Sequence, residues 1–96
     1  MDKVVRDGIL SKRNEYYWKQ DRRFVLYQSG RVLYFEPKTN EMRGHLQLTA
    51  RCHCERVSPK QFNLIVPGRT FNLYAAQEKA LDGWLQDINA VLQLLN

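Results

Sequence analysis

The chain has 96 residues, of which 44% are hydrophobic and 26% charged, and its formal net charge is +5 at pH 7. Such a chain is long enough for one domain with a core but too short for two, and its composition argues against disorder. No apolar run approaches the roughly 20 residues of a membrane-spanning helix, and no signal peptide opens the chain. Cys52 and Cys54 lie too close together for an ordinary disulfide between two elements, so we expect a reduced, cytoplasmic protein.

Seven strand-like runs follow one another from the N-terminus. They are Val4–Lys12, Arg22–Gln28, Val32–Glu36, Gly44–Thr49, Arg51–Val57, Gln61–Val66 and Thr70–Ala75. Turn signals separate them, and those at Ser29-Gly30 and Pro67-Gly68 are short enough for hairpins. The sequence therefore predicts an antiparallel sheet over most of its length.

The last segment, Ala76–Leu95, has a different pattern, because its apolar residues recur at steps of three and four. They are Ala80, Leu81, Trp84, Leu85, Ile88, Val91, Leu92 and Leu95. This spacing predicts one amphipathic helix with Trp84 in the core and with Asp82 and Asp87 as solvated charges on the opposite face. Seven strands and one helix indicate an α+β, mainly β, fold in which the helix closes an open end of a bent sheet.

The positive charge is concentrated in the first half of the chain. Residues 1–43 carry ten Lys and Arg against six Asp and Glu, whereas residues 44–96 carry five against four. A focused basic patch suggests a partner that carries phosphate groups, such as an anionic lipid or a nucleic acid. The alternative is a charged surface that only keeps the protein in solution.

Lys12 and Arg22 stand at the facing ends of the first two predicted strands. Because alternate residues of a strand share a face, Lys12 shares a face with the apolar Leu10. Arg22 likewise shares a face with Phe24 and Leu26. A cation in register with core residues at a strand end must lie at the rim of the core. Two such cations on adjacent strands, roughly 5 Å apart, would line a positively charged opening, which is a candidate anion site.

The chain resembles a pleckstrin homology (PH) domain in four features. These are the seven strands, the closing helix with a central Trp84, an opening G-x-L-x-K motif at Gly8–Lys12, and Arg22 just before an apolar strand. The resemblance implies a bent, seven-stranded antiparallel sandwich or partly open barrel, capped by one C-terminal helix. It further implies a single domain over residues 1–96, with strands at about 4–75 and the helix at about 76–95. Such a domain is expected to be a fragment of, or a module in, a larger protein.

Two stretches, LYFEPKTNEMRGHL and VPGRTFNLYA, resemble the PH domain of phosphoinositide-dependent protein kinase. By this resemblance, Arg43 and Arg69 are further head-group cations beside the primary pair, Lys12 and Arg22. Tyr34 would donate its hydroxyl to a phosphate.

The remaining cations of the first hairpin, Arg13, Lys19 and Arg23, are further candidates for the same site. Arg13 and Arg23 are expected to act through general electrostatics, and Lys19 points to the other face if its strand is regular. Gln20 stands where the family's lipid-binding pattern has Lys or Arg, and Asp21 would place a negative charge beside the site. These two residues predict weaker binding than the full pattern would give.

The resemblance implies a membrane-targeting module that recognises the phosphorylated inositol head group of phosphoinositides, with 3-phosphorylated lipids favoured. Such a module would be cytoplasmic and reversibly recruited to the membrane. Two alternatives stay open: a protein-interaction module on the same scaffold with weak or no lipid binding, and a receptor for soluble inositol phosphates. Nucleic acid is the least favoured partner.

Tyr16, Tyr17 and Trp18 form an aromatic run inside the basic loop. Aromatic residues favour the membrane–water interface, so insertion beside the head group is one interpretation. The alternative is that these side chains pack under the loop or continue the hairpin.

We find no catalytic or metal-binding pattern in the sequence. In Cys52-His53-Cys54, His53 would point away from the two cysteines, and a zinc site needs about four converging ligands. No nucleophile–base pair and no glycine-rich phosphate loop is evident. We therefore predict a binding domain that is not an enzyme and has no cofactor or metal, although the parent protein could be an enzyme such as a kinase.

Overall fold

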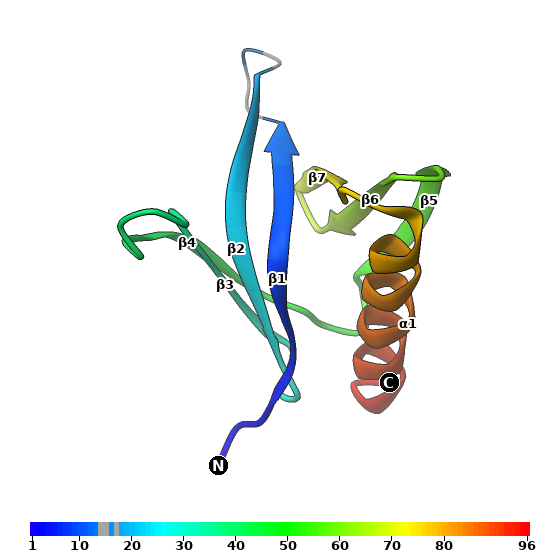
Figure 1. The fold of residues 1–96 in the computed structure, drawn as a ribbon. Helices are drawn as coiled ribbons and strands as arrows, with labels where there is room; N and C mark the ends of the chain where they lie inside the picture. Colours follow the sequence, from blue (N-terminus) through cyan, green and yellow to red (C-terminus); the bar gives the residue numbers. More distant parts are fainter. Residues whose placement is uncertain (14–15, 17) are drawn as a thin grey trace.

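A computed structural model describes residues 1–13, 16 and 18–96 of the chain. Within them, seven antiparallel strands form one sheet, and one helix follows at the C-terminal end (Figure 1). The elements are β1 (Val4–Arg13), β2 (Lys19–Tyr27), β3 (Arg31–Phe35), β4 (Met42–Gln47), β5 (His53–Ser58), β6 (Gln61–Val66), β7 (Arg69–Tyr74) and α1 (Glu78–Leu94). The strand order is β4-β3-β2-β1-β7-β6-β5, so the sheet stays open between β4 and β5. The predicted order of seven strands and a capping helix is confirmed.

The first hairpin is longer than predicted. β2 begins at Lys19 instead of Arg22, because the ladder between β1 and β2 continues as far as the pair Arg13–Lys19. Residues expected in the loop therefore lie in the sheet, where their side chains alternate between its two faces. β5 and α1 start slightly later than predicted, at His53 and Glu78.

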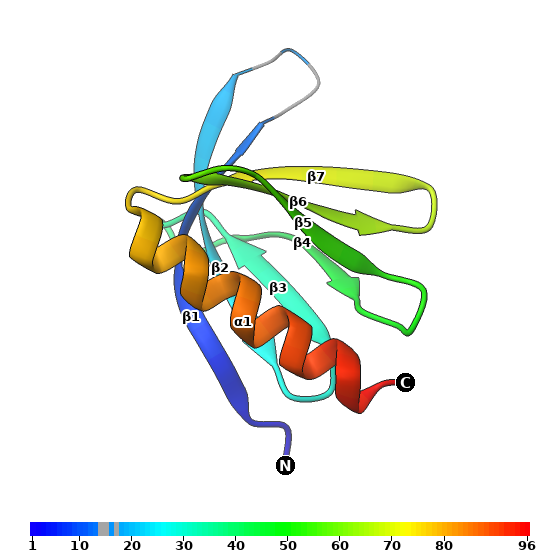
Figure 2. The same cartoon turned by 90° about the vertical axis from the view of Figure 1, so that its right-hand side faces the viewer.

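The core lies between the bent sheet and α1, which crosses one open end of the sheet (Figure 2). The sheet contributes the buried side chains of Leu10, Phe24, Leu26, Val32, Tyr34, Phe62, Leu64, Phe71 and Leu73, and the helix those of Leu81, Trp84, Ile88, Val91 and Leu92. The core position of Trp84 is confirmed, whereas Ala80, predicted on the same apolar face, is exposed. Each large apolar side chain buried here contributes about 1.5–3 kcal/mol. No helix of the described residues has the length and apolar character needed to cross a membrane.

Two acidic residues of the helix form ion pairs with arginines of the sheet. Asp87 accepts a hydrogen bond from Arg6 Nε of β1 at 2.6 Å, and Asp82 pairs with Arg56 of β5. The prediction that both are solvated charges is wrong for Asp87, whose side chain is 29% exposed, whereas Asp82 is 57% exposed and stays in contact with water beside its guanidinium partner. The opposite end of the sheet, where β1, β3 and β6 lead into their hairpins, is not covered by the helix (Figures 1 and 2).

Candidate anion-binding site

Lys12 and Arg22 lie on the core face of the sheet, near the end of the first hairpin. The register pairs Lys12 with Gln20 and Leu10 with Arg22, and residues directly opposite one another share a face. Leu10 is buried, while Lys12 and Arg22 are partly buried. The structure thus places both cations at the rim of the core, as the alternation indicates.

An aromatic cluster of Phe24, Tyr34 and Phe71 lies beneath Lys12. The rings of Phe24 and Tyr34 stack at 5.1 Å, and Phe71 meets Tyr34 edge-on at 6.4 Å. Lys12 Nζ is 5.9 Å from the ring centre of Tyr34 and 6.0 Å from that of Phe71. The guanidinium carbon of Arg69, from β7, is 4.1 Å from the ring centre of Phe71. Cations at such distances are attracted to the ring faces, so residues from β1 and β7 meet over one cluster.

The charges of Lys12, Arg22 and Arg69 act on one another. Burial lowers the pKa of Lys12 from its ordinary value of 10.5, and repulsion by Arg69 and then by Arg22 lowers it further. These three residues, which we call the basic mouth, therefore form one electrostatic unit. An anion bound among them would offset the repulsion that the Lys12 ammonium group experiences.

Arg22 is already engaged by acceptors of the protein itself. Its Nη1 donates to the backbone oxygen of Asp21 at 2.8 Å and to Glu36 Oε2 at 3.2 Å, and its Nη2 donates to Gln20 Oε1 at 3.3 Å. Glu36 is thus the carboxylate that pairs with a cation of the basic mouth. These bonds hold the guanidinium at the rim of the core before any ligand arrives.

Glu36 is not among the residues predicted from the sequence, although the sequence contains a signal for it. The turn at Ser29-Gly30 fixes the register of β2 and β3, in which Arg23 pairs with Phe35. Continuing that register by one residue brings Glu36 opposite Arg22. Cross-strand partners of a predicted site residue can therefore be read from the turn that joins the two strands.

Arg43 reaches the same end of the sheet because of a β-bulge. Tyr34 pairs with Gly44 but Phe35 pairs with Met42, so Arg43 is the extra residue on β4. It lines an open cleft of about 580 Å³ together with Arg22, Lys19 and the turn between β3 and β4. Its Nη1 is 3.6 Å from Glu41 Oε1.

The other three predicted cations lie on the outer face of the sheet. Lys19 and Arg13 are cross-strand partners, and their charged groups lie 4.0 and 5.4 Å from the ring centre of Tyr74. Arg23 forms an ion pair with Asp7 at 2.6 Å, and its hydrogen bond lowers the pKa of the Asp7 carboxyl. The alternation of the strands separates Arg13 and Arg23 from the basic mouth, whereas Lys19 also lines the cleft beside Arg22.

Asp21 also has its side chain on this outer face, where its Oδ1 accepts a hydrogen bond from Ser11 Oγ at 2.7 Å. The residue also lines the cleft that contains Arg22 and Arg43, so its negative charge stays beside the candidate site. Adjacent residues of a strand point to opposite faces, so only the backbone oxygen of Asp21 contacts Arg22.

Tyr34 is largely buried, with 7% of its surface exposed. Its ring lies against Gly44 of β4, and no hydrogen bond among the described residues involves its hydroxyl. The donation of this hydroxyl to a phosphate stays a prediction.

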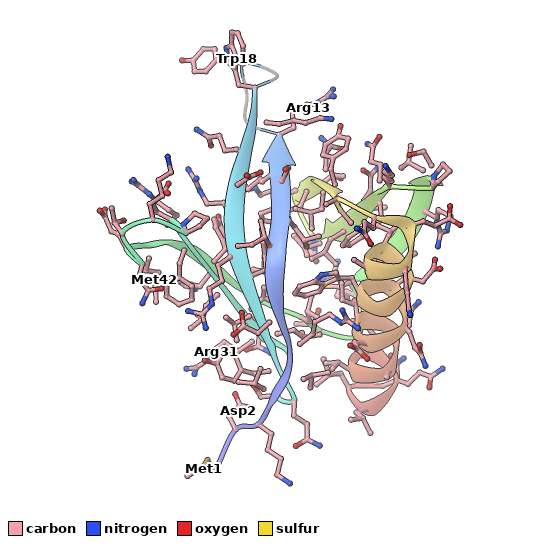
Figure 3. The ribbon with its side chains drawn as sticks, in the orientation of Figure 1. Met1, Asp2, Arg13, Trp18, Arg31 and Met42 are labelled. Atoms are coloured by element: carbon pink, nitrogen blue, oxygen red, sulfur yellow. The ribbon has the colours of Figure 1, made fainter. Side chains whose placement is uncertain are left out.

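Of the aromatic run in the first loop, Tyr16 and Trp18 are 71% and 72% exposed, and Tyr17 lies outside the described residues. Figure 3 shows Trp18 at the end of the first hairpin, beyond Arg13. The alternative in which the run packs under the loop does not hold for Tyr16 and Trp18.

The cysteines serve the packing of the fold. Cys52 is buried and its Sγ accepts a hydrogen bond from the backbone N–H of Thr49, while Cys54 lies beside Asn89 of the helix. Burial raises the pKa of the Cys54 thiol. Among the residues described, no group of three or more His, Cys, Asp or Glu side chains is placed to hold a metal ion.

A family model for the PH domain matches residues 1–96 of the chain. Among solved structures, the C-terminal PH domain of pleckstrin in complex with D-myo-Ins(1,2,3,4,5)P5 has a TM-score of 0.82 at 21% identity, over 98% of this chain and 99% of that one. The PH domain of human oxysterol binding protein-related protein 11 has a TM-score of 0.80 at 26% identity, over 97% and 82%.

The linker-DH/PH fragment of p115-RhoGEF is also similar, with a TM-score of 0.84 at 17% identity. The match covers 99% of this chain but only 30% of that fragment. The chain therefore spans less than a third of the RhoGEF fragments whose fold it shares.

Proposed function

Because this chain belongs to the PH domain family, we propose that it is a membrane-targeting module that binds the phosphorylated inositol head group of phosphoinositides. PH domains are binding modules and not catalysts, and they bind inositol phosphates or proteins. Lys12, Arg22 and Arg69 are the proposed primary ligands of the phosphates.

The observation that carries this proposal is the convergence of three cations, two of which lie over one aromatic cluster. Lys12 and Arg69 come from β1 and β7, and both lie within 6.0 Å of the ring centre of Phe71. Burial first, and then repulsion by Arg69 and Arg22, lowers the pKa of Lys12, and a bound anion would offset the repulsive part. Arg43 adds a fourth cation from the rim of the neighbouring cleft.

The residue types suit a phosphorylated ring. A guanidinium offers paired donors to a single phosphate, whereas an ammonium group is a compact charge that can bridge two phosphates. Each basic residue close to an anionic membrane also contributes about 1 kcal/mol of attraction before any specific contact. Stereospecific and general electrostatic binding therefore use the same side chains and must be separated by experiment.

Two likenesses support this choice of ligand. The pleckstrin domain of the same fold was solved with an inositol pentakisphosphate. The stretches at residues 33–46 and 66–75 resemble those of a kinase domain that favours 3-phosphorylated lipids, so we propose the same preference for this chain. Exposed Tyr16 and Trp18 would then rest at the membrane–water interface beside the head group.

Co-sedimentation with vesicles that differ only in their phosphoinositide, at constant total negative charge, tests the proposal. Binding that follows the phosphorylation pattern of the inositol supports stereospecific recognition. Equal binding to every vesicle would mean that binding depends only on the total negative charge and not on the positions of the phosphates. Loss of binding to all vesicles at low salt would leave the protein-interaction function, and competition by free inositol phosphates distinguishes a soluble ligand from a lipid.

A further inference from the structure

The ion pair between Arg22 and Glu36 is the most buried of those described. The side chains of Arg22 and Glu36 are 13% and 22% exposed, whereas in every other described pair both partners are at least 29% exposed. Because a half-buried pair is screened less by water and salt, its attraction is stronger than that of a surface pair. A ligand that takes hold of Arg22 must therefore compete with Glu36.

The turn between β3 and β4 holds Glu36 in place. Its Oε1 accepts a hydrogen bond from the backbone N–H of Lys38 at 3.1 Å. Its backbone N–H donates to the oxygen of Glu41, and its own backbone oxygen accepts from Asn40, both at 2.8 Å. The carboxylate is thus anchored beside Arg22 and stays near any anion that displaces it.

The other two cations of the basic mouth face no such competitor among the described ion pairs. Neither Lys12 nor Arg69 takes part in one, and both are engaged with the ring of Phe71. An anion can therefore bind first at Lys12 and Arg69. Once it is held there, its further phosphates act on Arg22 at a high effective concentration.

We propose that Glu36 is an internal competitor for Arg22, and that it sets how many phosphates a ligand must carry to occupy the basic mouth. This inference rests on the proposed function. A ligand with one phosphate, such as inorganic phosphate, cannot hold Lys12 and Arg69 and also replace Glu36 at Arg22. A ligand with several phosphates can do both, so Glu36 makes the mouth selective for multiply phosphorylated rings at the expense of affinity.

Calorimetric titration of the whole chain with D-myo-inositol pentakisphosphate and with inorganic phosphate tests this inference. The variants are Glu36→Gln and, as a control with the same change in net charge, Glu78→Gln in the exposed first turn of α1. We expect Glu36→Gln to bind the pentakisphosphate about tenfold more tightly and to gain measurable affinity for inorganic phosphate. Glu78→Gln should change affinity by less than about twofold because it acts only through long-range charge.

A double-mutant cycle shows whether Glu36 acts through Arg22. In an Arg22→Ala background, adding Glu36→Gln should improve affinity no more than Glu78→Gln does. Glutamine keeps the acceptor for Lys38, and thermal unfolding checks that each variant folds. If Glu36→Gln binds no more tightly than the wild type, the inference is overturned while head-group binding stands. If neither protein binds either anion, both the inference and the proposed function fail.

Discussion

The ring of Tyr34 in β3 lies so close to its cross-strand partner Gly44 in β4 that a Cβ atom at position 44 would overlap the phenol hydroxyl and ring. A glycine is required here by the close approach of the ring and not by the backbone conformation. The position of the aromatic cluster under Lys12 therefore depends on a residue without a side chain on the neighbouring strand.

Gly44→Ala should destabilise the fold by about 1–3 kcal/mol, because the new methyl group displaces a buried ring. Urea denaturation measures this loss. Adding Tyr34→Phe removes the oxygen nearest to the methyl group, so the double variant should recover part of the stability. A double variant no more stable than Gly44→Ala alone would contradict the assignment of the clash to Tyr34.

Arg22→Ala and Arg23→Ala remove the same charge from adjacent residues on opposite faces of β2. Arg22→Ala should weaken inositol phosphate binding by at least about tenfold, because it removes a paired donor from the basic mouth. Arg23→Ala should change affinity by less than about threefold, because Arg23 is paired with Asp7 on the outer face. Calorimetric titration at one ionic strength makes the comparison, and equal losses would contradict the location of the site.

Lys12→Met should weaken anion binding and at the same time raise the stability of the free protein at pH 7 by at most about 1 kcal/mol, because solvent around the partly exposed ammonium group screens much of the repulsion. The folded state lowers the pKa of Lys12, through burial first and then through repulsion by Arg69 and Arg22. Below the folded-state pKa, Lys12 is protonated in both states, so the folded state bears the full penalty of the charge. Above the unfolded-state value of about 10.5 it is neutral in both states, and the penalty is absent.

The stability gained by Lys12→Met should therefore shrink as the pH rises through the folded-state pKa toward 10.5. Urea denaturation of both proteins at pH 7 and near pH 10 follows this difference. A gain that is the same at both pH values would mean that the charge of Lys12 is not its source.

The core and the position of the first two site cations could be predicted from the sequence, because strand alternation alone determines them. Leu10, Phe24 and Leu26 are buried, and Lys12 and Arg22 follow in the same register at the rim. A strand predicted to begin at Lys19 would also have placed the side chains of Asp21 and Arg22 on opposite faces of the sheet.

The rest of the site depends on relationships between strands distant in sequence. Lys12 meets Arg69 because the bent sheet places β7 beside β1, and no local pattern encodes that curvature. Arg43 faces the cleft because of a bulge of one residue, which reverses the face that a regular ladder would give it. The position of Glu36 beside Arg22 depends on the register of β2 and β3. Composition alone could therefore not predict that a carboxylate faces the three cations of the basic mouth.

Gly83, in the middle of α1, has a reason to be glycine that helix propensity alone would miss. A Cβ at this position would overlap the guanidinium of Arg6, which pairs with Asp87 and lies 5.6 Å from the ring centre of Trp84. Gly→Ala in a helix interior normally gains about 1 kcal/mol. Here the methyl group must displace Arg6 and weaken its ion pair, so Gly83→Ala should leave the free energy of unfolding nearly unchanged.

In an Arg6→Ala background the same Gly83→Ala substitution should stabilise the protein by about 1 kcal/mol, because the space beside the helix is then open. Urea denaturation of the wild type, Gly83→Ala, Arg6→Ala and the double variant completes this double-mutant cycle. Equal effects of Gly83→Ala in both backgrounds would show that Arg6 does not restrict this position.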